Sequence, residues 1–119
     1  MSRAALLAAG IALIAGVTAP AVARGPVAIG VAQHEFRIST YRKVVKPGPV
    51  KFNITNYGED THNLVVAGPR RFQVTGPDVE PGERAALPLR LRRPGTYLLL
   101  CTRANHLSLG MRAKLVVRR

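Results

Sequence analysis

The sequence contains a single cysteine, no tryptophan and only six acidic residues among its 119. One cysteine excludes an internal disulfide framework and a zinc site built from cysteines alone. The acidic residues show no paired arrangement typical of carboxylate catalysis, and no local Ser/His/Asp motif surrounds the three histidines. What remains is a strongly basic chain, with 18 Lys and Arg residues and a formal net charge of +12.

Size and composition favour one small β domain. A chain of this length forms one domain at most. The hydrophobic fraction of 47% is too high for a disordered basic tail and supplies a small core. Nine prolines and eleven glycines favour short strands joined by turns over a bundle of helices.

The N-terminal segment has the pattern of a secretory signal peptide. Arg3 gives it one positive charge, and an uncharged apolar stretch follows at positions 4–18. An Ala-Val-Ala sequence ending at Ala23 supplies the small residues that a signal peptidase reads. We therefore expect residues 1–23 to be cleaved and residues 24–119 to form an exported domain, periplasmic or extracellular. The alternative is an uncleaved segment that tethers the protein to a membrane.

The rest of the chain is predicted to form short strands between turns. Turn signals recur about every ten residues without a long helical period, which is typical of a β-sandwich or a small barrel. Pro88 within its strand indicates an edge position. The apolar run at 97–101 is expected to be buried on both faces. The expected strands cover residues 27–31, 34–39, 50–54, 63–66, 87–92, 97–101 and 113–117.

One loop between two expected strands carries the side chains with metal chemistry. Cys101 stands at its start, His106 at its middle and Met111 at its end. Thiolate, imidazole and thioether form the ligand set that softer transition metals prefer, copper above all. His62 is the natural candidate for a second imidazole, because it opens a strand after a Gly-containing loop. Two His and one Cys in a plane, with a distant axial Met, form the blue-copper arrangement.

Each of these residues also has a simpler interpretation. Cys101 could be a small buried hydrophobe, Met111 a core gap-filler and His106 a solvated loop residue. After the leader, however, the chain has one Cys, one Met and three His. The single Cys and the single Met lie ten positions apart with a His between them, so a shared metal site explains them better.

The pattern resembles that of the cupredoxins, the type 1 blue copper proteins. The resemblance covers about residues 27–117 and rests on Cys-x4-His-x4-Met, starting at Cys101, and on the upstream sequence Asn-Tyr-Gly-Glu-Asp-Thr-His-Asn-Leu. It implies a Greek-key β-sandwich with one copper ion beneath the loops at one end. The ligands that it implies are His62, Cys101, His106 and Met111.

The resemblance also assigns roles beside the ligands. Asn63 and Thr102, each next to a ligand in sequence, look like the residues that join the two ligand loops by hydrogen bonds and fix the ligand geometry. The loop departs from the family pattern, since Thr-Arg-Ala-Asn stands before His106 where Pro-Gly is often found.

This ligand set favours the transfer of single electrons over catalysis. A rigid sandwich lets the site reorganise little when an electron moves, and no position open to substrate is required. The edge of His106 is the expected electron port. An oxidase or reductase would need further copper centres, but only His34 remains, which we interpret as a strand residue near the surface. A copper carrier or storage protein is the alternative; such proteins often offer several Met, whereas only Met111 follows the leader.

The excess of Lys and Arg indicates which kinds of partner the protein binds. Arg103 lies in the metal loop and Arg112 directly follows Met111, so both are expected to steer an acidic redox partner toward the copper. No nucleic-acid motif accompanies the charge, and an exported chain would rarely meet nucleic acid. Contact with anionic lipid is expected through Arg118 and Arg119. A small electron shuttle of this kind is expected to be a monomer.

Overall fold

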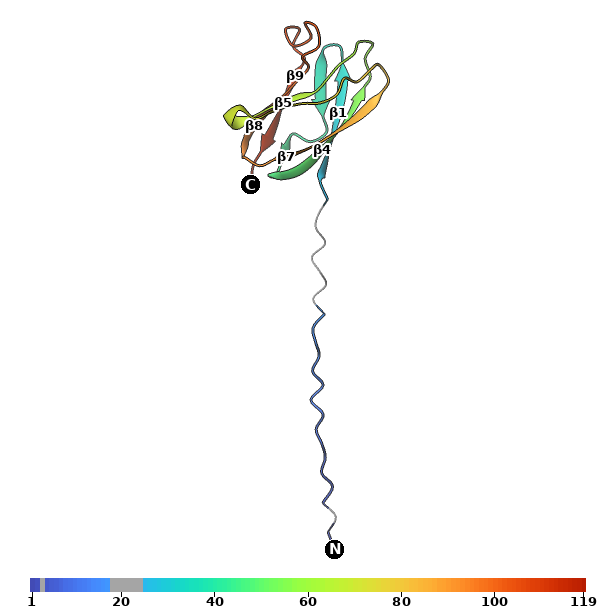
Figure 1. Ribbon diagram of the computed structural model, residues 1–119, viewed down its shortest axis with the longest axis vertical. Helices are drawn as coiled ribbons and strands as arrows, with labels where there is room; N and C mark the ends of the chain where they lie inside the picture. Colours follow the sequence, from blue (N-terminus) through green and yellow to red (C-terminus); the bar gives the residue numbers. More distant parts are fainter. Residues whose placement is uncertain (3, 18–24) are drawn as a thin grey trace.

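The structure is a computed structural model that describes residues 1–2, 4–17 and 25–119. The expected cleavage point after Ala23 and the start of the domain at residue 24 lie outside the described residues. Residues 4–17 contain no helix or strand, and their side chains are exposed (Figure 1). Among the described residues, no helix combines the length and the apolar character needed to cross a membrane.

The described residues form nine strands in two sheets that face each other (Figure 1). The strand order is β2-β1-β4-β7 in one sheet and β3-β9-β8-β5-β6 in the other. The chain passes between the sheets after β2, β3, β4, β6 and β7, and the pairs β1–β4 and β3–β9 are parallel. The expected Greek-key β-sandwich is confirmed. The strands are β1 (Val27–His34), β2 (Arg37–Thr40), β3 (Val44–Val45), β4 (Gly48–Asn56), β5 (Val65–Ala67), β6 (Gln73–Thr75), β7 (Arg84–Leu91), β8 (Gly95–Leu100) and β9 (Arg112–Val117), with a 3-10 segment, η1 (Pro69–Arg71), between β5 and β6.

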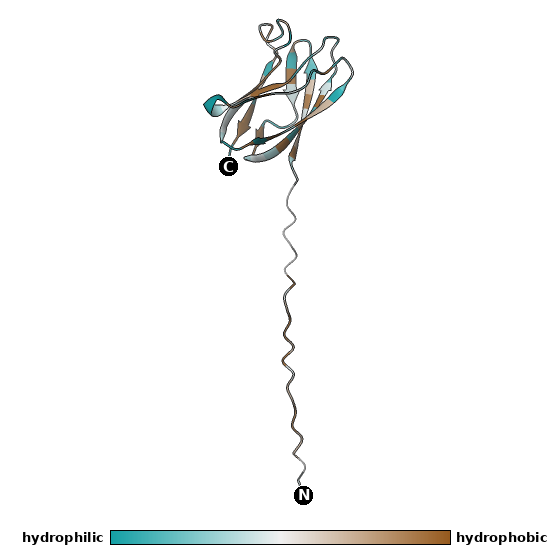
Figure 2. Cartoon of the chain, viewed as in Figure 1, coloured by the Kyte–Doolittle hydropathy of each residue, from teal (hydrophilic) through white to brown (hydrophobic). Residues whose placement is uncertain are grey.

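The core lies between the sheets, because every second side chain of a strand points to the same face. Ile29 and Phe52 enter it from the first sheet, and Leu99 and Leu115 from the second, all without solvent exposure. Figure 2 shows hydrophobic residues along the strands and a hydrophilic η1 segment at the edge of the sandwich. Pro88 lies in β7, an edge strand as predicted, where a missing amide hydrogen is tolerated.

Two expectations about strands are wrong. Residues 34–39 are not one strand: His34 ends β1 and pairs with Arg37 of β2, and the two residues between them form the turn. Polar and apolar residues alternate through residues 34–39, although the chain reverses direction within this segment in a tight hairpin. The run at 97–101 is not buried on both faces, because the outer face of its sheet is uncovered; Leu98 is 36% exposed, whereas Tyr97 and Leu99 are buried.

The strand register places the connecting segments at two ends of the sandwich. The loop end carries the β1–β2 turn and the segments at 57–64, 76–83 and 101–111. The other end, here called the terminal end, carries the starts of β1 and β4 and the ends of β7 and β9. At this end Val27 pairs with Val50, Gly48 pairs with Leu91, and Val117 at the end of β9 pairs with Gly95.

Candidate metal centre

Three donor side chains meet at the loop end, although they come from two separate loops. His62 and Cys101 are fully buried, and His106 is 5% exposed. The Nδ1 atoms of the two histidines lie 3.2 Å apart. The Cys101 Sγ atom lies 3.8 Å from His62 Nδ1 and 3.5 Å from His106 Nδ1. Within the described part of the chain, these three residues form the group able to hold a metal ion.

The separations fit one shared ion. Metal bonds of about 2.1 Å to nitrogen and about 2.3 Å to sulfur put three donors in one plane roughly 3.5–3.8 Å apart. The observed distances of 3.2, 3.5 and 3.8 Å lie near this range. A soft thiolate with two imidazoles is the donor set of a type 1 copper ion. The residues present therefore fit copper.

His62 is held in place by its backbone. It forms an isolated β-bridge with Val79, in which the His62 amide donates to Val79 O at 3.1 Å and the Val79 amide donates to His62 O at 2.7 Å. Because both main-chain groups are fixed, the buried imidazole keeps its direction toward the other donors.

The loop from Cys101 to Met111 closes on itself. The Cys101 amide donates to Met111 O and the Met111 amide donates to His106 O, both at 3.1 Å. The His106 amide donates to Arg103 O at 3.0 Å. Met111 is fully buried, directly before β9. All four sequence-predicted ligands are therefore brought to the loop end and buried there.

Asn63 and Thr102 connect the two ligand loops. Asn63 Nδ2 donates to Thr102 Oγ1 at 2.9 Å, and the Thr102 amide donates to Asn63 Oδ1 at 2.8 Å. Gln33 of β1, which the sequence did not single out, adds a third contact by donating from Nε2 to Asn63 O at 2.9 Å. The loop that carries His62 is thus tied both to the Cys101 loop and to the sheet.

Sequence reasoning missed two carboxylates that contact the histidines from outside. Glu35 Oε1 lies 3.2 Å from His62 Nε2, and Asp60 Oδ2 lies 3.3 Å from His106 Nε2. Each imidazole therefore meets a carboxylate at Nε2 while its Nδ1 faces the other donors, an arrangement that fixes ring orientation in metal sites. Asp60 is only two positions before His62, but the histidine that it contacts is His106 of the other loop, so this spacing does not indicate the contact. Glu35 comes from a different turn, and no local pattern indicates it.

The surroundings shift the pKa values of Glu35 and His62 downward. The amide of Asp60 donates to the Glu35 carboxylate, as does the amide of Glu59, each at 2.7 Å, and these bonds lower the pKa of Glu35 below its ordinary value. Burial lowers the pKa of His62, because a charged imidazole loses its hydration there, and the neighbouring His106 adds to this effect. Both shifts favour a neutral His62 beside an ionised Glu35.

The remaining predicted residues lie around the centre. The Phe36 ring packs against the His106 ring with a centroid distance of 5.0 Å. The edge of His106, which is the expected electron port, is therefore largely covered by Phe36. Arg103 is paired with Asp78 at 3.2 Å, and Arg112 is exposed at the start of β9. His34 is half-buried at the end of β1.

All six acidic residues of the chain lie in the loops of this end, which the sequence order alone does not reveal. Their bonds place them there: the Asp60 carboxylate meets His106, that of Asp78 meets Arg103, and Glu80 accepts from Thr61. The six are Glu35, Glu59, Asp60, Asp78, Glu80 and Glu83.

No family model matches the sequence, and no curated protein matches it. Solved structures do. Dithionite-reduced auracyanin from the photosynthetic bacterium Roseiflexus castenholzii is 21% identical with a TM-score of 0.68, over 80% of this chain and 100% of that one. Auracyanin A, a "blue" copper protein from Chloroflexus aurantiacus, is 22% identical with a TM-score of 0.67, over 79% and 100%. A reduced Cu(I) form of an amicyanin mutant is 26% identical with a TM-score of 0.54, over 82% and 87%. The three share the two-sheet fold of this chain.

Proposed function

We propose that this protein, whose fold is that of the cupredoxins, binds one type 1 copper ion and passes single electrons between redox partners. The observation that carries the proposal is the meeting of two Nδ1 atoms and one Sγ atom within 4.8 Å in a buried site. His62, Cys101, His106 and Met111 are the proposed ligands. Copper held by such a set alternates between Cu(I) and Cu(II).

The protein's own residues keep the site ready for either state. Cys101 presents a sulfur that is shielded from water, and the two histidines present Nδ1 atoms whose rings are oriented by Glu35 and Asp60. The bonds between Asn63 and Thr102 hold both loops at a fixed separation. Ligands fixed before the ion binds need little rearrangement when its charge changes, and this favours fast electron transfer.

The same residues argue against a catalytic role and leave one alternative. The ligands are buried, so a substrate would have no direct route to the ion. A copper carrier or storage protein would use similar ligands but must release its metal. The test is to cycle the copper-loaded protein with dithionite and ferricyanide in the presence of a Cu(I) chelator. An electron carrier keeps its copper over many cycles; loss of copper in the first cycle supports the carrier.

We propose that the redox partner docks over the loop end with an acidic patch that contacts Arg112 and Arg103 and avoids the six carboxylates gathered at the same end. The pairing of Arg103 with Asp78 offsets part of its charge, so Arg112 is the sharper test. Arg112→Glu should slow association with an acidic partner at low salt, while Lys114→Glu, farther along β9, should change it less. Equal effects of the two variants would reject this docking site.

The apolar N-terminal segment supports export to the periplasm or the outside of the cell, with cleavage after Ala23. The mass of the protein purified from its host decides this: loss of residues 1–23 supports the exported domain, and an intact N-terminus supports a membrane tether. The same sample, analysed by light scattering, tests whether the protein is the expected monomer.

A further inference from the structure

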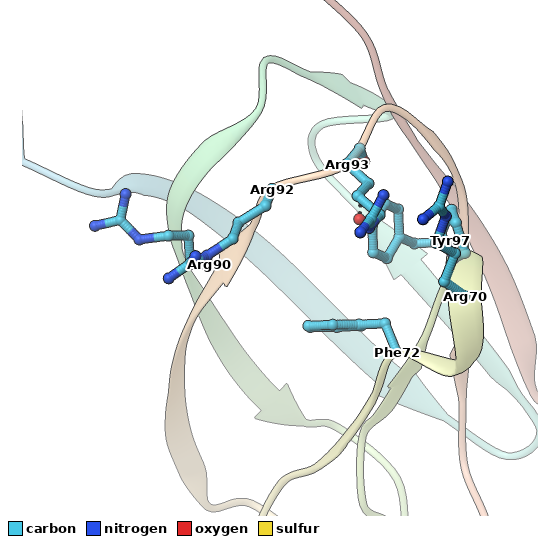
Figure 3. Close-up of a pocket in the computed structure, with 7 residues that line it drawn as sticks. Arg70, Phe72, Arg90, Arg92, Arg93 and Tyr97 are labelled. Atoms are coloured by element: carbon cyan, nitrogen blue, oxygen red, sulfur yellow. Dashed lines mark hydrogen bonds between the residues drawn. The ribbon is translucent and has the colours of Figure 1, made fainter.

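The terminal end of the sandwich carries a pocket rimmed by arginines. It has a volume of about 330 Å³, and Arg70, Arg90, Arg92 and Arg93 line it. Figure 3 shows the Phe72 ring below these side chains, with Arg90 and Arg92 toward the left and Arg93 and Arg70 toward the right. The pocket thus combines four exposed guanidinium groups with an aromatic surface.

These arginines have no acidic partner among the described residues. The ion pairs of the described chain lie at the loop end, where all six carboxylates are gathered. The terminal end carries further cations on neighbouring segments: Lys46, Arg71, Arg118 and Arg119. Backbone bonds bring these segments together, since the Arg118 amide donates to Val45 O at 3.0 Å and Val117 pairs with Gly95. The result is a face with many positive charges and no side-chain carboxylate.

The backbone of this face is constrained. Arg70 and Arg71 both have left-handed conformations, with φ of 55° and 62°, which residues with a side chain rarely adopt. Gly95 has a φ of +147°, and a Cβ added there would lie 2.7 Å from Pro69 Cγ. Gly68 similarly lets the Tyr97 ring approach closely. Strained positions held by their surroundings occur most often at functional sites, and here they set the direction of η1 and its arginines.

Arginine chemistry and the size of the face indicate the ligand class. Guanidinium groups bind phosphate oxygens with paired hydrogen bonds. One small phosphate ester carries about two negative charges and would offset about two of the eight cations, whereas a bilayer offers anionic headgroups across the whole face.

We propose that the terminal end docks onto the phosphate headgroups of an anionic membrane, with one headgroup in the arginine pocket beside Phe72. The metal centre lies at the opposite end of the sandwich, so this orientation leaves it facing away from the membrane and free to meet a partner. The proposal does not depend on copper, because none of the pocket residues is a proposed ligand.

The test is binding of the chain that starts at residue 24, which contains every strand and the whole core, to vesicles of phosphatidylcholine with and without phosphatidylserine. The variant Arg92→Gln/Arg93→Gln is compared with Arg37→Gln/Arg84→Gln, which removes the same charge from the loop end. Since each basic residue near an anionic surface strengthens binding about fivefold, we expect roughly 25-fold weaker binding for the pocket variant and a change of only a fewfold for the control. Lipids with a paramagnetic headgroup should broaden the amide signals of Lys46, Arg93 and Arg118, and not those of the metal loop.

Three results would overturn the proposal. Equal losses in the two variants would mean that net charge alone drives binding. Binding to pure phosphatidylcholine would mean that the headgroup charge is irrelevant. Binding of glycerol 3-phosphate as tightly as of vesicles would assign the pocket to a soluble phosphate ester instead. Running each assay on both the metal-free and the copper-loaded protein separates failure of this proposal from failure of the copper site.

Discussion

Asn63 and Thr102 exchange two hydrogen bonds across the loops that carry His62 and Cys101, at 2.9 and 2.8 Å. The two residues are 39 positions apart in the chain, and Asn63 is 6% exposed. The bonds therefore couple the stability of the fold to the geometry of the metal centre.

Replacement of Asn63 should weaken both properties. Asn63→Ala removes both bonds and leaves the Thr102 amide without its partner, so we expect the free energy of unfolding of the metal-free protein to fall by about 1–3 kcal/mol in urea titrations. Thr102→Val is the matched variant, because it keeps the amide bond and loses only the hydroxyl, for about 1 kcal/mol. If Asn63→Ala were no less stable than Thr102→Val, the two bonds would not act as described.

The contact between Asp60 and His106 predicts an effect on copper retention. Asp60→Asn should weaken copper binding about 10- to 100-fold, since a carboxylate that orients a ligating imidazole typically contributes this much to metal affinity. Competition with a chelator measures it. Glu59→Gln is the control, because Glu59 is an adjacent exposed carboxylate and contributes only its backbone amide to the site. Equal affinities of the two variants would contradict the role of Asp60.

The lowered pKa values predict acid sensitivity of the metal-free protein. Glu35 and His62 both take up a proton more readily in the unfolded chain than in the folded one. The contribution of His62 is therefore fully present above about pH 6.5 and that of Glu35 above about pH 4.5, their ordinary pKa values, and each is lost as the pH falls further. Free energies of unfolding measured from pH 8 downward should decrease. In Glu35→Gln the part of the decrease near the ordinary pKa of glutamate should disappear, and an unchanged profile would show that Glu35 does not contribute.

Met111 is expected to tune the site rather than build it. Met111→Leu conserves volume in the buried position, so the change in stability should stay below about 1.5 kcal/mol. The reduction potential should rise, because loss of a weak axial donor destabilises Cu(II) more than Cu(I). Voltammetry measures the potential, and Met111→Gln, which offers a harder oxygen donor, should lower it. A potential that is the same in all three proteins would remove Met111 from the ligand set.

Local patterns predicted much of the fold. Residues 50–54 alternate strictly and lie in the middle of β4, and 113–117 fill most of β9. The errors have one physical origin: periodicity reports which faces are apolar, and it does not report where neighbouring strands stop. The alternation of 34–39 thus continued across a hairpin, and the apolar run at 97–101 concealed an uncovered outer face.

The sequence indicated those residues of the metal centre that lie close together in the chain. Cys101, His106 and Met111 are evenly spaced in one loop, and the scarcity of their residue types made them visible. Glu35 and the gathering of all acidic residues at the loop end could not be predicted, because both depend on which loops the topology brings together. Glu35 lies 27 positions from His62, and only the folding of the sandwich brings the two side chains together.

The visible spectrum of the metal-free protein, recorded as one equivalent of Cu(II) is added, tests the central claim most directly. The account predicts an intense blue band from charge transfer between the Cys101 thiolate and the metal, saturating at one copper per chain and absent in Cys101→Ser. Circular dichroism of that variant confirms that it still folds. A colourless protein, or a band that persists in Cys101→Ser, would contradict a type 1 copper centre built from these residues.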